Sequence, residues 1–140
     1  MSFWLNAGTG VATIITHSFV TKCFMTGVFR LKTTADATKK DEVKKVIDSQ
    51  FYKRCHASQL NEMEWSAIFV PCFLFFNLKG IDCTWAATLA AWGQIAYFWP
   101  RAFQGHIHEG GMDPPPYLPG AIMRYVSLGM IVNIMWQQFF

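Results

Sequence analysis

The sequence predicts an all-α integral membrane protein built as a bundle of four transmembrane helices. Hydrophobic residues make up 52% of the chain and aromatic residues 16%, and the mean hydropathy is +0.20, a combination that few soluble domains of 140 residues show. A membrane-spanning helix needs about 20 mostly apolar residues, and four such stretches occupy most of the chain. They lie at residues 3–29, 58–78, 83–103 and 117–140, within a single domain that covers residues 1–140.

The first predicted span, residues 3–29, has no positively charged region ahead of it and no clear small-residue cleavage site. We therefore expect it to be retained as a helix rather than removed as a signal peptide. It contains His17 and Lys22, and ionisable groups inside a membrane span are functional candidates. They can equally pair within the bundle or extend to the membrane interface.

The basic segment at residues 30–54 connects the first two spans. It holds eight of the chain's twelve Lys and Arg residues and four of its nine acids. The positive-inside tendency places this loop in the cytosol and both termini on the opposite side of the membrane. Nucleic acid is not expected as a partner because the lysines alternate with acids and no binding motif accompanies them. Contact with anionic lipid is the favoured interpretation.

The second span, residues 58–78, begins with a polar stretch that includes Asn61, Glu62 and Glu64. An ionised side chain at the bilayer centre costs about 2.5 to 3.5 kcal/mol on insertion scales. These residues must therefore lie near the interface, or face other helices or a polar ligand.

The third and fourth spans differ in how they begin. Residues 83–103 are rich in alanine, and small residues permit close contact between membrane helices. The fourth span, at 117–140, follows a segment with two glycines and three prolines that cannot be helical.

His106, His108 and Glu109 precede that segment, but they have no partner at zinc spacing, so we predict no metal site. A transporter or channel is disfavoured because the spans show no internal repeat.

Three sequence motifs occur in a fixed order along these spans. They are TGVFRL at residues 26–31, RCHASQLNEME at residues 54–64, and GQIAYF at residues 93–98. Together with the four spans and the basic first loop, they resemble the MAPEG family, the membrane-associated proteins of eicosanoid and glutathione metabolism. The resemblance covers about three quarters of the chain, and it implies a homotrimer in the endoplasmic reticulum, with mitochondrial membranes as the alternative location.

The resemblance implies glutathione as the cofactor and identifies the residues that would bind it. Arg30 would hold a carboxylate of the tripeptide in bidentate geometry, and Glu64 would receive its ammonium group. Asn61 lies one helical turn before Glu64, Gln59 would add a contact to the peptide backbone, and Tyr97 would reach the ligand from the third span.

The group that would stabilise the glutathione thiolate is less directly indicated. Gln94 stands where the family usually has arginine, and Arg101 stands where many members have a second tyrosine. An expected arginine before Asn61 is also missing. Either Arg101 or Arg124 is the replacement that we predict, because either places a cation near the cytosolic mouth of the bundle.

The prediction for function is a membrane-bound glutathione transferase or peroxidase. It would act by thiolate attack on lipophilic electrophiles or lipid hydroperoxides that enter from the bilayer. The alternative is a non-catalytic protein of the same fold, either a lipid-binding protein or a structural subunit of a larger membrane complex. The missing arginines and tyrosine favour that alternative.

Overall fold

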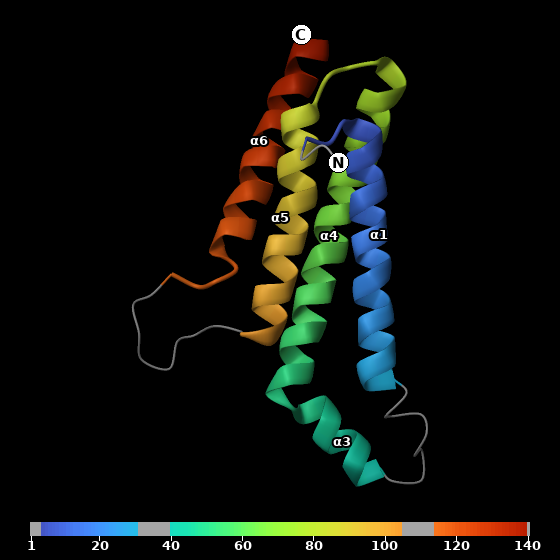
Figure 1. Ribbon diagram of the computed structural model, residues 1–140, viewed down its shortest axis with the longest axis vertical. Helices are drawn as coiled ribbons and strands as arrows, with labels where there is room; N and C mark the ends of the chain where they lie inside the picture. The colour runs from blue at the N-terminus through green and yellow to red at the C-terminus, as the bar shows by residue number, and fades with distance from the viewer. Residues whose placement is uncertain (1–3, 31–39, 105–113, 140) are drawn as a thin grey trace.

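The computed structural model describes residues 4–30, 40–104 and 114–139, and the secondary structure of these residues is helical (Figure 1). The helices are α1 (Ala7–Met25), a π-helical turn η1 (Thr26–Arg30), α3 (Lys40–Asp48), α4 (Gln50–Lys79), α5 (Thr84–Phe103) and α6 (Leu118–Phe139).

The four long helices lie side by side, and the short α3 extends from one end of the group (Figure 1). α1 packs on α4 and α5, α4 packs on α5, and α6 packs mainly on α5. The start of α1 and the end of α6 lie toward the same end, opposite α3 (Figure 1). Four helices that cross a bilayer in alternating directions would place the two ends in this way. The side of the membrane that each end faces stays a prediction.

The core depends on large side chains of one helix packing against small side chains of another. Such interdigitation lets helix axes approach closely at native packing density. The completely buried core residues include Phe69, Phe73 and Phe76 of α4, and Ala86, Ala87, Ala90 and Ala91 of α5.

The segment predicted as a loop at residues 30–54 contains α3 and the start of α4, so α4 begins earlier than the predicted residue 58. Ser49 explains the early start, because its hydroxyl oxygen accepts the backbone N–H of Tyr52 at 3.2 Å. A serine in this N-cap position stabilises a helix by about 1 kcal/mol. The first helix begins at Ala7 for the same reason, since the side chain of Asn6 accepts the N–H of Thr9 at 2.9 Å.

Two of the described helices are long and apolar enough to cross a membrane. They are Ala7–Phe29, with a mean hydropathy of 1.2, and Leu118–Phe139, with 1.4. α4 carries Asn61, Glu62 and Glu64, and α5 contains three tryptophans, Gln94 and Arg101, all of which lower hydropathy. Membrane spanning by α4 and α5 therefore stays a prediction.

Candidate functional site

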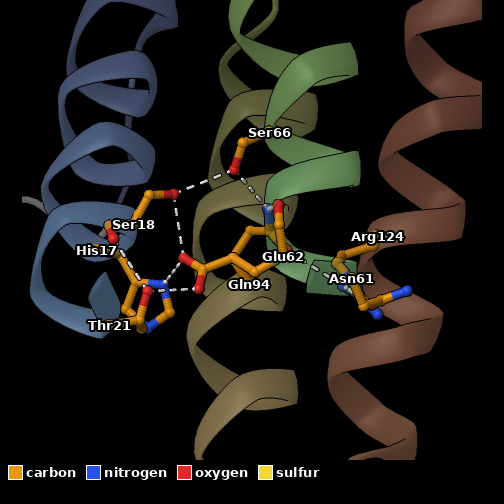
Figure 2. A network of polar contacts seen from close by, with 8 residues as sticks. All are labelled: His17, Ser18, Thr21, Asn61, Glu62, Ser66, Gln94 and Arg124. Atoms are coloured by element: carbon orange, nitrogen blue, oxygen red, sulfur yellow. Dashed lines mark hydrogen bonds and ion pairs between the residues drawn. The ribbon is translucent and has the colours of Figure 1, made fainter. Parts of the chain in front are cut away.

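Arg124 of α6 is the largest of the fully buried side chains, with 2% of its surface exposed. It fits between α5 and α6 because Gly93 has no side chain, and a Cβ there would lie 2.9 Å from Cγ of Arg124. Its Nη1 donates to Oδ1 of Asn61 at 2.9 Å and to Oε1 of Gln94 at 3.2 Å. Side chains of α4 and α5 thus fix the guanidinium of α6 (Figure 2).

Tyr97 of α5 contacts two arginines. Cζ of Arg124 lies 3.6 Å from the centroid of the Tyr97 ring, and 4.9 Å from that of Trp65. Arg101, one turn after Tyr97, donates a hydrogen bond to its hydroxyl group. A cation over an aromatic face is stabilised by about 0.5 to 2 kcal/mol, so the aromatic rings help to hold two positive charges close together.

Arg124 has no carboxylate partner in the part of the chain that the structure describes, where the one recorded contact between a basic and an acidic side chain joins His17 and Glu62. Nε of Arg124 is buried and has no hydrogen-bond partner among the described residues. A buried charge costs several kcal/mol unless an opposite charge or hydrogen bonds compensate for it. A guanidinium in this setting is suited to a carboxylate or a thiolate of a ligand.

Glu62 forms a second polar centre, between α1 and α4, and only 1% of its surface is exposed. Oε1 of its carboxylate accepts hydrogen bonds from Nδ1 of His17 at 2.7 Å and from the Ser18 hydroxyl at 3.1 Å, and Oε2 accepts one from the Thr21 hydroxyl at 2.7 Å. Sequence reasoning singled out His17 but did not name Glu62 as its partner. The available signal was a pair of ionisable side chains, His17 and Glu62, in neighbouring predicted spans. Packing sets the helix rotations that turn these side chains toward each other.

Hydrogen bonds connect the two centres across the bundle (Figure 2). Ser18 and Ser66 share a hydrogen bond of 3.2 Å between their hydroxyl groups. Nε2 of Gln94 donates to the Ser66 hydroxyl and to the backbone carbonyl of Glu62, each at 3.1 Å, while its Oε1 accepts from Arg124. Gln94, which departs from the family pattern, is thus the residue that joins Arg124 to the Glu62 centre.

The structure brings together four of the seven predicted site residues. Asn61, Tyr97, Arg101 and Arg124 form one cluster, which contains both predicted catalytic arginines and two of the predicted glutathione ligands.

The other three predicted residues lie elsewhere. Gln59 lines a separate cavity of about 170 Å³ with Lys22 and His56, and its buried Nε2 has no hydrogen-bond partner in the part of the chain that the structure describes. It is separated from Asn61 because two residues along a helix are about 200° apart. Glu64 is exposed on α4. Arg30 is the last residue of η1, and its side chain lies outside the described residues.

His106, His108 and Glu109 also lie outside the described residues. Among the residues that the structure does describe, no three His, Cys, Asp or Glu side chains are placed to hold a metal ion.

Comparison with curated proteins and with solved structures returned no match. A family model matches residues 8–136, and its description is MAPEG family. The matched range contains each residue of the Arg124 cluster and of the Glu62 centre. The chain therefore belongs to the MAPEG family and is a membrane protein of the glutathione transferase and eicosanoid metabolism family.

Proposed function

We propose that the protein is a membrane-bound glutathione transferase or peroxidase that acts on lipophilic electrophiles or lipid hydroperoxides. The observation that carries this proposal is the buried guanidinium of Arg124, which has no carboxylate partner among the described residues. Members of the MAPEG family generally use glutathione, an anionic tripeptide with a thiol. The charge of the cluster and the charge of that ligand are complementary.

The chemistry requires a glutathione thiolate near neutral pH. A free thiol titrates near about 8.5, and each unit by which that pKa falls corresponds to about 1.4 kcal/mol of preferential stabilisation of the thiolate. Arg124 and Arg101 would supply this stabilisation as preorganised positive charge. Asn61 and Tyr97 would fix the guanidinium groups and contact the ligand.

The two activities differ in the atom that the sulfur attacks. In transfer, the thiolate bonds to an electrophilic carbon and the leaving group departs with its electron pair. In peroxide reduction, the thiolate attacks the terminal oxygen, the O–O bond breaks, and the alkoxide takes up a proton. A second glutathione then reduces the resulting sulfenic acid, which yields the disulfide and water.

An assembly of several copies would complete this site. The face of α4 that carries Glu64 also exposes Leu60, Met63 and Ile68, with 56%, 50% and 44% of their surfaces accessible. A carboxylate on such a face is costly against lipid, and another copy would cover it. We propose the homotrimer that the family resemblance implies, with Glu64 at the interface and available to the ammonium group of glutathione. A mass near three times 16.0 kDa for the detergent-solubilised protein, after subtraction of the detergent, is the expected result.

The test is equilibrium binding of glutathione to the detergent-purified protein, with thiolate absorbance followed in the ultraviolet across pH. We expect saturable binding and a thiol pKa below that of free glutathione. Arg124→Lys keeps the charge but loses the planar fork, so its affinity should fall by about tenfold or more, since a hydrogen bond to a charged group contributes about 1.5 to 3 kcal/mol. Glu64→Gln should also weaken binding.

Lys79→Gln is the matched control, because Lys79 is an exposed cation at the far end of α4. Equal affinities of Arg124→Lys and Lys79→Gln would remove Arg124 from the site. No binding to an intact oligomer would refute the enzymatic proposal. That result would favour the non-catalytic alternative, a lipid-binding protein or a structural subunit of a larger complex.

A further inference from the structure

A groove between α1 and α5 is lined in part by His17, which lies on the side of Glu62 away from Arg124 (Figure 2). Its volume is about 450 Å³, within the range of about 300 to 1,000 Å³ that is typical of small-molecule sites. Val20, Ile95 and Trp99 give it an apolar lining, and Thr16 and His17 add polar groups.

His17 is the buried polar group of this groove, and 8% of its surface is exposed. Its Nδ1 is hydrogen-bonded to Glu62, whereas its buried Nε2 has no hydrogen-bond partner within residues 4–30, 40–104 and 114–139. Phe98 and Trp99 pack edge-to-face against the imidazole, with centroids 5.8 and 6.1 Å away, and so fix the plane of the ring. A buried polar atom without a partner costs about 1 to 3 kcal/mol, and a ligand atom that bonds to it would recover this energy.

The partners of Glu62 determine what Nε2 can bind. Three donors converge on the carboxylate of Glu62, which suits the ionised form because that form only accepts hydrogen bonds. When the imidazole carries a single proton, that proton lies on Nδ1 toward the carboxylate, and Nε2 then presents a lone pair. An O–H group can donate to that lone pair, whereas a ligand carboxylate would add a second negative charge next to Glu62.

We propose that the α1–α5 groove is a binding site for a single apolar chain that carries a neutral O–H group, with the hydroxyl donating to Nε2 of His17. The apolar chain would lie along Val20, Ile95 and Trp99. This site is distinct from the Arg124 cluster and does not depend on the binding of glutathione, so its test involves no glutathione.

The test is binding of radiolabelled hexadecanol to the full-length protein in nanodiscs, in competition with hexadecyl methyl ether and with hexadecanoate. The ether has the same chain but no donor, so we expect it to bind about tenfold more weakly. The carboxylate should bind more weakly than the alcohol as well. Equal affinity for alcohol and ether, or a preference for the carboxylate, would overturn the proposal.

Val20→Trp would fill the groove without altering the His17–Glu62 pair, and it should abolish binding. Ile15→Trp is the matched control, because Ile15 is exposed on the same helix to a similar extent, 52% against 45%, but does not line the groove. Equal binding by the two variants would place the alcohol elsewhere. Nitrogen-15 spectra give an independent readout: the Nε2 resonance of His17, assigned with His17→Gln, should move on addition of hexadecanol and not on addition of the ether.

Discussion

Gly120→Ala should loosen the contact between α5 and α6 that holds Arg124 in place. A Cβ at Gly120 would lie 2.6 Å from the carbonyl carbon of Ala96 and 2.8 Å from Cα of Tyr97. Carbon atoms normally approach to about 3.5 to 4.0 Å, so the helices would have to separate by about 1 Å. The atoms in the way belong to the backbone, so no side-chain rotation relieves the clash.

The expected net cost follows from two opposing terms. Overpacking of a core costs about 1 to 3 kcal/mol, while replacing glycine by alanine in a helix gains up to about 1 kcal/mol. We therefore expect a net destabilisation of about 1 to 2 kcal/mol, equivalent to a fall in Tm of roughly 3 to 8 °C. Thermal unfolding of the detergent-solubilised protein, followed by circular dichroism, measures this change.

Gly129→Ala provides the control on the same helix, because no described atom other than its chain neighbours and the adjoining backbone of α6 lies within 4 Å of a Cβ at that position. This variant should keep or raise the Tm, since only the gain in helix propensity applies. If the two variants have the same Tm, the close approach of α5 and α6 at Gly120 does not exist in the protein.

Two further predictions concern carboxylates. Glu62→Gln should lower the free energy of unfolding by about 1 to 3 kcal/mol, because the amide turns a donor toward groups that already donate. Asp48→Asn, at an exposed carboxylate of α3, should change it by less than about 0.5 kcal/mol, and thermal unfolding that ranked the two variants in the opposite order would contradict the Glu62 geometry. At the α4–α5 turn, the backbone N–H and hydroxyl of Thr84 lower the pKa of Asp82. Its carboxylate thus contributes stability above its ordinary pKa that is lost as pH falls through the lowered value. Asp82→Asn should flatten this acid dependence in a series of melts across pH, and an unchanged slope would show that Asp82 is not its source.

The positions of the helices could be predicted largely from local sequence. Apolar stretches of sufficient length and a segment with three prolines indicate where α5 and α6 begin and end, to within one residue. The start of α4 was predicted too late, because the prediction followed the apolar pattern. α4 begins with a polar turn capped by Ser49, and such a turn has no hydropathy signal.

The candidate site was predicted only in part. Asn61 and Tyr97 were predicted from the family motifs, and Arg101 and Arg124 from their position near the predicted cytosolic mouth. The structure brings the four residues together. The same reasoning grouped Gln59 with Asn61, although the two residues face different neighbours on α4.

By itself, the sequence determined that this is a helical membrane protein of the MAPEG family, because hydrophobic length and motif order are properties of the chain alone. Only the tertiary structure decided which polar groups meet: Arg124 with Asn61 and Gln94, and His17 with Glu62. The physical reason is that each pairing depends on the rotation and spacing of whole helices. Those are set by side-chain packing, including the absence of a side chain at Gly93 and Gly120, and not by any local pattern.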